Sequence, residues 1–375
     1  MTALSTLRIL DPGDGHRTHD FSPSNETTAS LEVSEAMFSA GWTDGLPAVA
    51  CTPELLAQFL AHTTKDEDEV LVSMPHLNRQ CTVREAAINA AMAGCRPEYF
   101  PVVIAAWESL AALGIGSSAL WQSTTGSAPM LIVNGPAAEE LGINAAGNVF
   151  GSGFRANATI GRAIRLASLN VFHLRPHLLD QATQGSPAKY TCCIAENEAL
   201  SPWQPYHVDA GHDRGTSTVT ALLIRGTLPI EARHTAVPEE LLLDFTNSAA
   251  RTGRLIGSNS TICIVFGPEH AALLGEANWS KEDIKQFIHE NSLRSSVEFN
   301  RVGKGAVSQR TGWRVPADHP DAIPPANEDA EYIFESPSSI EIVVAGADNA
   351  GVSTIVETMG LRTRRPTTVA IDPAP

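Results

Sequence analysis

Short apolar runs alternate with longer amphipathic stretches along this chain. The clearest apolar runs are residues 130–133, 261–265 and 340–344, and their length is typical of buried strands. A glycine-containing turn and a segment that we expect to be helical follow each of them. Strands that alternate with helices predict an α/β fold with mostly parallel sheets flanked by helices.

The first two runs are similar in sequence. IVNGP at residues 132–136 matches IVFGP at residues 264–268, and a long predicted helix precedes each of them, at 97–113 and 238–250. The match suggests an internal duplication of a strand–Gly–Pro–helix unit. Coincidence is the alternative, because such units are common. The third run is expected to lead into a helix near residues 352–359.

Changes in composition predict five parts of the chain. They are a polar N-terminal arm at 1–30, an α/β domain with a glycine-rich loop at 31–200, a second α/β unit at 201–314, a proline-rich linker at 315–330, and a small C-terminal strand–helix unit at 331–375. Further strands are expected at 69–73, 190–195 and 217–225, and a helix is expected after Thr52, with Pro53 at its first position.

Charge and composition narrow the function classes. The 375 residues are 43% hydrophobic and 18% charged, and the net charge is -16. A negative field repels polyanions, which disfavours nucleic acid and anionic membranes as partners. There is no signal-peptide pattern and no long apolar span, and none of the six cysteines forms a CxxC pair, so we expect a cytoplasmic protein. The apolar fraction also leads us to expect a homo-oligomer.

Cys95 is the first candidate for chemistry. It precedes Pro97, which is a natural first residue of a helix. Helix N–H groups and the neighbouring Arg96 would favour a thiolate, and a thiolate is a usable nucleophile. The alternative is a buried cysteine that acts as a small hydrophobe.

A glycine-rich loop, GNVFGSG at residues 147–153, leads into a predicted helix that carries Arg155 and Arg162. Glycines let backbone N–H groups approach a ligand, and guanidinium groups grip carboxylates or phosphates. The loop is neither a P-loop nor a dinucleotide fingerprint, so we expect no cofactor. A solvated loop is the alternative. The predicted substrate-binding residues are Arg155, Asn157, Thr159, Arg162, Lys189, Asn134, Gly151 and Gly153.

Two further groups of residues are candidates for proton transfer. Cys193 lies in a predicted strand and could share a pocket with Glu196. His207 lies in a loop with Asp209, His212 and Asp213, whose spacing matches no strong metal signature. We therefore expect His207 to act as a general base rather than as a metal ligand. Asn134 ends a strand, where open α/β sheets bind ligands.

Several stretches together carry a family resemblance. They are GWTDGLP (41–47), AAMAGCRPEY (90–99), IVNGP (132–136), RANATIGR (155–162), GSPAKY (185–190), AENE (195–198) and SPW (201–203). Over roughly residues 40–225 the chain resembles the UGSC family of bacterial (seleno)proteins, named for selenocysteine or cysteine followed by Gly-Ser-Cys. The resemblance implies thiol or selenol chemistry. This chain contains no Cys-Gly-Ser-Cys, so a dithiol cycle does not carry over, whereas the framework around Cys95, Arg155, Asn157, Arg162, Lys189 and Glu196 does.

The favoured hypothesis is an enzyme whose Cys95 thiolate attacks a small carboxylated substrate. Arginines would hold the anion while His207 or Glu196 moves protons, which suits carbon–heteroatom cleavage, hydration or hydrolysis. The alternatives are a thiol redox subunit whose partner carries the missing motif, a metal-dependent hydrolase that uses His207, Asp209 and His212, and a non-catalytic binding protein.

Overall fold

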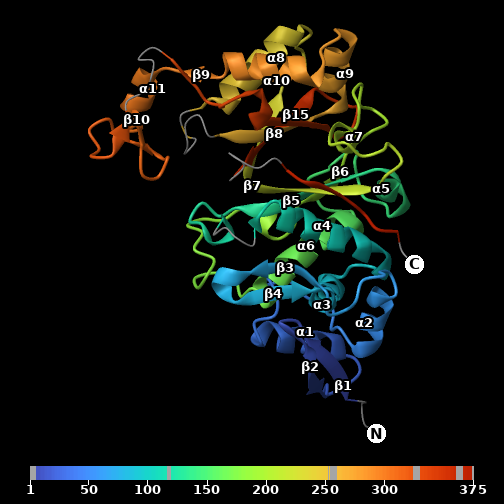
Figure 1. Cartoon of the computed structure of the whole chain (residues 1–375). Helices are drawn as coiled ribbons and strands as arrows, with labels where there is room; N and C mark the ends of the chain where they lie inside the picture. Colours follow the sequence, from blue (N-terminus) through green and yellow to red (C-terminus); the bar gives the residue numbers. More distant parts are fainter. Residues whose placement is uncertain are drawn as a thin grey trace. The chain divides into compact units, whose positions relative to one another are not determined.

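The main β-sheet has seven strands and is mixed. The computed structural model describes residues 6–115, 120–251, 253, 260–323, 330–359 and 366–373. The strand order is β14 (Ile340–Val344), β8 (Thr261–Phe266), β15 (Val352–Thr358), β7 (Thr218–Glu231), β5 (Ala128–Asn134) and β6 (Cys193–Ala195), with β16 (Thr368–Ala370) paired to β7. Figure 1 labels β8, β15, β7, β5 and β6 of this sheet.

The prediction of a mostly parallel sheet is wrong. The pairs β14–β8 and β5–β6 are parallel, whereas β15–β8, β5–β7 and β16–β7 are antiparallel. A parallel crossover needs a dozen or more residues, usually with a helix. Residues 345–351, between β14 and β15, contain no helix, and only the single turn α7 (Tyr206–Asp209) lies between β6 and β7. The α/β class itself is confirmed.

The chain divides into two compact units, which are described separately below. Unit 1 comprises Met1–Glu196, His207–Arg225 and Pro366–Pro375, and unit 2 comprises Asn197–Tyr206 and Gly226–Arg365. The first segment of unit 1 thus ends near the boundary expected at residue 200, but the chain returns to this unit twice.

Three helices form the interior of unit 1. They are α3 (Val83–Ala93), α4 (Phe100–Ala112) and α6 (Arg155–Asn170). A capping box of Thr82 and Glu85 begins α3, which is buried over most of its length. In α6, a Cβ at Gly161 would lie 2.5 Å from Thr191 Oγ1 and 2.8 Å from Cys192 N. Glycine therefore lets this helix lie directly against the backbone of residues 191–192.

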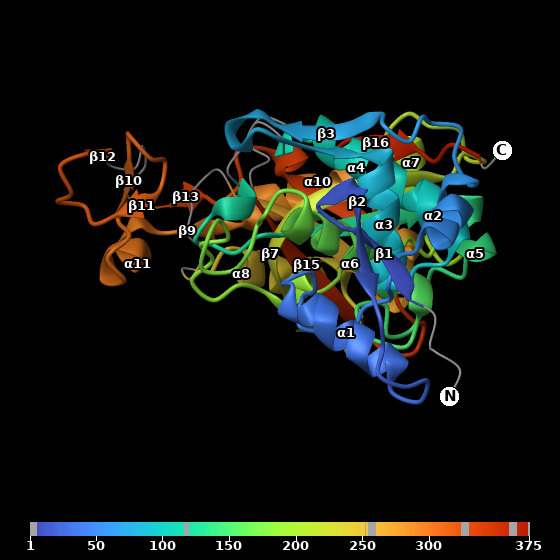
Figure 2. The same ribbon diagram turned by 90° about the horizontal axis from the view of Figure 1, so that it is seen from below.

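The N-terminal part of unit 1 is more structured than predicted. Instead of a polar arm, β1 (Leu7–Asp11) and β2 (Asp14–Phe21) form an antiparallel hairpin, while residues 1–5 lie outside the described residues. Helix α1 (Ala29–Ser39) follows it. In α2 (Pro53–Leu60), the predicted cap is confirmed, because Thr52 Oγ1 accepts a hydrogen bond from Leu55 N. A second hairpin, β3 (Val70–Met74) with β4 (Arg79–Thr82), lies beside α4 (Figure 2).

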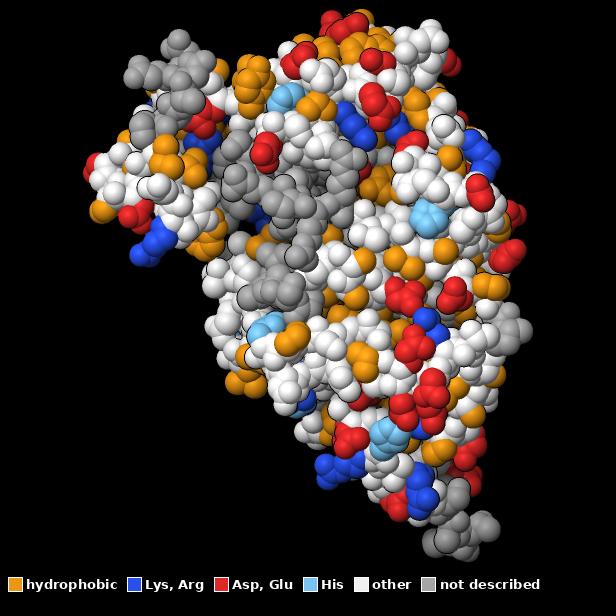
Figure 3. Space-filling view, viewed as in Figure 1, with side chains coloured by type: hydrophobic (Ala, Val, Ile, Leu, Met, Phe, Trp, Pro, Cys, Tyr) orange, Lys and Arg blue, Asp and Glu red, His pale blue; other side chains and the backbone are white. Residues whose placement is uncertain are grey.

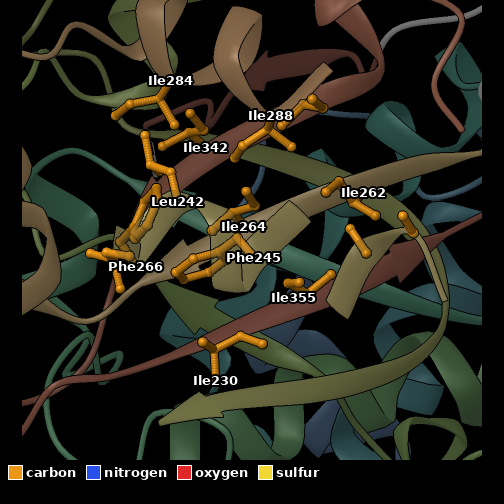
Figure 4. Close-up of a cluster of buried hydrophobic side chains, with 14 of the residues drawn as sticks. Ile230, Leu242, Phe245, Ile262, Ile264, Phe266, Ile284, Ile288, Ile342 and Ile355 are labelled. Carbon is orange, nitrogen blue, oxygen red and sulfur yellow. The ribbon is translucent and has the colours of Figure 1, made fainter. Parts of the chain in front are cut away.

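Unit 2 has its own apolar core. Helices α8 (Pro238–Ala249) and α10 (Lys281–Asn291) pack their aliphatic and aromatic side chains against β8, β14 and β15 (Figure 4). Helix α9 (Pro268–Glu276) confirms that a helix follows the apolar run at 261–265. The helix expected at 352–359 is instead strand β15. Five of its seven residues are β-branched, a composition that favours strands.

Short elements complete the described chain. Residues 315–330, predicted to be a linker, contribute to a three-stranded sheet of β10 (Ala306–Ser308), β11 (Arg314–Val315) and β12 (Ala322–Ile323), while residues 324–329 lie outside the described residues. The other short helices are α5 (Pro136–Glu140) and α11 (Ser296–Arg301), and the other short strands are β9 (Leu293–Arg294) and β13 (Glu331–Tyr332). The 3-10 turns are η1 (Pro75–Leu77), η2 (Pro97–Tyr99), η4 (Leu120–Gln122), η5 (Pro187–Lys189) and η6 (Pro337–Ser339).

Two observations concern the surface and the length of the helices. Acidic and basic side chains are interspersed among the described residues of the face shown in Figure 3. Within the described ranges, no helix is both long enough and apolar enough to cross a membrane.

Candidate functional site

One side of α6 brings several of the predicted site residues to the C-terminal end of α3. Arg155 Nε donates to the Gly94 carbonyl at 3.0 Å, and Arg162 Nη1 donates to the Ala93 carbonyl at 3.4 Å. Thr159 lies between these arginines, with its methyl group 3.6 Å from the place of a Cβ on Gly94. Arg155, Thr159 and Arg162 are spaced at i, i+4 and i+7, so they share a helix face next to Cys95.

The predicted low pKa of Cys95 is wrong. The side chain is 6% exposed, and burial raises the pKa of its thiol to about 12, which outweighs the opposing effects of Thr159, Arg155 and Arg162. Position also differs from the prediction, because Pro97 begins a 3-10 turn and α4 begins only at Phe100. Cys95 N instead donates to the Ala90 carbonyl at 3.1 Å, at the C-terminal end of α3, where the helix dipole disfavours an anion.

Two of the predicted substrate-binding residues are engaged with the protein itself. Arg162 forms a two-point ion pair with Asp44, with both N–O distances at 2.8 Å, and it also donates to the carbonyls of Leu46 and Pro47. Asn157 accepts from Asn144 N and donates to the carbonyls of Asn144 and Cys193. These contacts hold the loops around α6, so their observed role is to position the backbone.

The glycine-rich loop closes on itself. Gly151 N donates to the Asn148 carbonyl, and Asn148 Nδ2 donates to the Ser152 carbonyl. A Cβ on Gly151 would lie 2.0 Å from Asn148 Oδ1, and Gly153 has a φ of 123°. Gly153 therefore has a backbone conformation that favours glycine, whereas a side chain at Gly151 would displace the Asn148 amide, whether or not the loop also binds a ligand.

Another pair of predicted residues meets at the ends of β5 and β6. Asn134 Nδ2 donates to Glu196 Oε2 at 2.5 Å, and both side chains are buried. Cys193 was also predicted to take part in proton transfer. Burial raises the pKa of its thiol well above the usual range, which disfavours this role.

His207 is fully buried on α7, with Nε2 3.3 Å from the Arg214 carbonyl. In the described part of the chain, no three His, Cys, Asp or Glu side chains are arranged to hold a metal ion.

A cavity of about 650 Å³ in unit 1 contains the remaining predicted residue, Lys189. Its walls are residues 176–177, 180–187 and 189–190, which belong to the segment between α6 and β6, together with Asp44, Arg165 and Leu169. Cys95 and the glycines of the loop are not among the residues that line it. The polar lining includes the side chains of Lys189, Asp180 and Arg165.

These three side chains form a compact ion cluster. Lys189 Nζ lies 2.6 Å from Oδ1 and 2.5 Å from Oδ2 of Asp180, and Arg165 Nη2 lies 3.6 Å from the same Oδ2. Arg165 Nε donates to the Lys189 carbonyl at 2.9 Å. The exposed fractions of the side chains are 3% for Asp180, 9% for Arg165 and 15% for Lys189.

The pKa values of both basic members of the cluster are lowered. Burial lowers the pKa of Lys189, Arg165 lowers it further, and Asp180 opposes both effects. Burial also lowers the pKa of Arg165. A buried base beside a cavity is typical of functional sites.

Two members of this cluster were not predicted. Arg165 follows Arg162 by one helical turn, and that spacing was a usable signal in a predicted helix. Asp180 lies in a segment without periodicity, and nothing near it in the sequence indicates that it meets Lys189. Asp44 belongs to one of the stretches that carry the family resemblance, but its pairing with Arg162 depends on the tertiary structure.

No family model, no curated protein and no solved structure matches the chain. The resemblance to the UGSC family therefore stays a prediction from the quoted stretches.

Proposed function

We propose that the chain is an enzyme that binds a small carboxylated molecule in the cavity lined by Arg165, Lys189 and Asp180. The observation that carries this proposal is that two cations share one carboxylate. Asp180 contacts both Lys189 and Arg165, while the other lining carboxylate, Asp44, is already paired with Arg162. The network of these five side chains contains three cations and two anions, so an added carboxylate would balance its charge.

The size and the lining of the cavity support the same ligand class. Small-molecule sites usually have volumes of about 300–1,000 Å³ and a few fixed polar groups among apolar walls. The cavity volume of about 650 Å³ lies in that range. A guanidinium group has five N–H donors in a planar fork, so Arg165 is suited to a carboxylate oxygen pair. Next to the bound molecule, the Asp180 carboxylate supplies a base and the Lys189 ammonium group supplies an acid.

Cys95 remains the reactive group of a second candidate function, thiol-dependent chemistry on an anion. The supporting observation is the position of Arg155, Arg162 and Thr159 beside the sulfur, since each of them favours the thiolate. Against it, the pKa near 12 keeps the resting thiol protonated. Both candidates concern a small anion, but they place it on different parts of α6.

Ligand-induced thermal stabilisation tests the first candidate. Full-length protein is screened with small carboxylates and with the matching neutral amides, and we expect only carboxylates to raise the melting temperature. Arg165→Gln and Lys189→Met should weaken binding by about 10- to 100-fold, because each removes a charged hydrogen-bond donor.

Lys65 provides the matched control. Its side chain is 18% exposed, close to the 15% of Lys189, and it is also ion-paired, with Glu69 and Glu108. Lys65→Met should bind the carboxylate as the wild type does. Binding that survives Arg165→Gln and Lys189→Met but is lost in Cys95→Ser would replace the first candidate with the second.

We further infer that the two units contain a duplicated element. In unit 1, β5 is followed by Gly135-Pro136 and has one parallel neighbour, β6, and one antiparallel neighbour, β7. In unit 2, β8 is followed by Gly267-Pro268 and has the parallel neighbour β14 and the antiparallel neighbour β15. A Cβ on Gly135 would lie 2.4 Å from the Thr216 carbonyl oxygen, and one on Gly267 would lie 2.2 Å from that of Val352.

A further inference from the structure

We propose that Lys189 is a nucleophile that forms an imine with the carbonyl carbon of a 2-oxo acid bound in the cavity. The inference rests on the proposed function, since it uses the same cavity and the same anion. It adds the chemical class of the substrate and assigns a covalent role to one lysine.

The arrangement of the cluster matches the two functional groups of a 2-oxo acid. Such a molecule carries a carboxylate next to an electrophilic carbonyl carbon. Arg165 and Lys189 both contact Asp180, so a guanidinium group and an amine lie on the same wall of the cavity. The guanidinium group can hold the substrate carboxylate while the adjacent carbonyl faces the amine.

Asp180 is placed to move the protons of this reaction. Its two oxygens lie 2.5 and 2.6 Å from Lys189 Nζ, so it can accept a proton from the ammonium group. The free amine then adds to the carbonyl carbon, the C=O π bond breaks, and the oxygen takes the proton from Asp180. Asp180 then takes a proton from the nitrogen and passes it to the new hydroxyl group, which leaves as water, so that a protonated C=N bond joins the substrate to Lys189. No electron is gained or lost by the protein.

Lys65 shows what distinguishes Lys189 from an ordinary ion-paired lysine. One ammonium group contacts two carboxylates at Lys65, and their effects raise its pKa despite partial burial. At Lys189, two cations contact one carboxylate, and burial with Arg165 lowers the pKa instead. Asp44, His177 and Tyr190 are the other titratable groups that line the cavity. A lowered pKa increases the fraction of neutral amine, which is the nucleophilic form.

Reductive trapping tests the assignment. Full-length protein is incubated with pyruvate or 2-oxoglutarate and sodium cyanoborohydride, and labelled peptides are mapped by mass spectrometry. We expect a stable adduct on Lys189 whose added mass is that of the acid less one oxygen atom. Trapping should increase with pH and level off below the ordinary lysine pKa of 10.5. Lys65→Arg should be labelled like the wild type, and Lys189→Arg should lose the adduct.

A parallel measurement with lactate separates this inference from the proposed function, because lactate has the carboxylate but no carbonyl. If lactate stabilises the protein and no adduct forms on Lys189, the imine is refuted while the anion site stands. If neither lactate nor the two 2-oxo acids bind, both proposals fail. Equal labelling of Lys65 and Lys189 would also overturn the assignment, because it would show unselective reaction of lysines.

Discussion

Cys95 and Lys189 show how surroundings decide the reactivity of a single side chain. Both lie in unit 1, and arginines of α6 are close to each of them. For the thiol, burial raises the pKa because it disfavours the anion. For the amine, burial lowers the pKa because it disfavours the cation. The same physical effect thus reduces the nucleophilicity of Cys95 and increases that of Lys189.

We expect iodoacetamide to label native Cys95 very slowly. A pKa of about 12 leaves roughly one thiol in 10⁵ ionised at neutral pH, and the thiolate is the reactive form. Mass spectrometry of native and urea-unfolded protein over time measures the difference, with the unfolded chain as the control in which every cysteine is accessible. Rapid native labelling of Cys95 near neutral pH would show that its thiol ionises easily and would restore the thiolate hypothesis.

Sequence patterns identified individual residues better than their partners. Lys189 and Glu196 were both selected from the sequence. In the structure, Lys189 lines a cavity and Glu196 accepts a buried hydrogen bond from Asn134. The partner of Lys189, Asp180, is nine residues away in an irregular segment, so no periodicity connects the two. The low pKa predicted for Cys95 failed because the onset of α4 and the depth of burial depend on tertiary packing.

Among the structural elements, the strand–Gly–Pro turns are the most constrained. Gly135 has a φ of 81°, and both Gly135 and Gly267 lie where a Cβ would collide with a backbone carbonyl. Gly135→Ala and Gly267→Ala should each lower the free energy of unfolding by about 1–3 kcal/mol from overpacking. Gly135→Ala should lose roughly 1–2 kcal/mol more, because alanine disfavours a positive φ.

Denaturant unfolding measures both glycine variants. Gly226→Ala is the matched control, because a Cβ there would meet nothing within 4 Å. Its stability should stay within about 0.5 kcal/mol of the wild type, as for most unconstrained substitutions. Wild-type stability in either Gly135→Ala or Gly267→Ala would show that the turn can move away, and the proposed equivalence of the two turns would lose its main support.

Strand existence was easier to predict than strand direction. The apolar runs at β5, β8 and β14 were recognised, and the expectation of parallel pairing holds for β5–β6 and β14–β8, which helices connect. It fails for β15 and β7, because no long helix precedes them. Residues 352–359 were assigned to a helix by analogy with the first two repeats, although their β-branched residues favour a strand.

For the molecule as a whole, buried thiols predict a loss of stability at alkaline pH. Burial raises the pKa of Cys51 and Cys95 to about 12 from the ordinary 9.0, and it also raises the pKa of Cys81 and Cys193. Between these values the unfolded chain releases thiol protons that the folded chain retains. The stabilisation is therefore complete below pH 9.0 and decreases as pH rises towards 12.

Unfolding experiments over this pH range provide the measurement. Each thiol should contribute up to about 1.4 kcal/mol of lost stability per pH unit. Because tyrosines and lysines titrate in the same range, the test is the difference between wild type and Cys51→Ala. The variant should start less stable but lose stability less steeply as pH rises. Parallel slopes would show that Cys51 ionises as readily in the folded chain as in the unfolded one.

The central claim is that a small carboxylate binds in the cavity of unit 1 between Arg165 and Lys189. A crystal structure of the full-length protein with the most strongly stabilising carboxylate tests it most directly. We predict ligand density inside the cavity, with a carboxylate oxygen at about 2.7–2.9 Å from the Arg165 guanidinium group. Ordered ligand elsewhere, for example beside Arg155 and Cys95, with the Lys189–Asp180–Arg165 cluster unchanged, would contradict it.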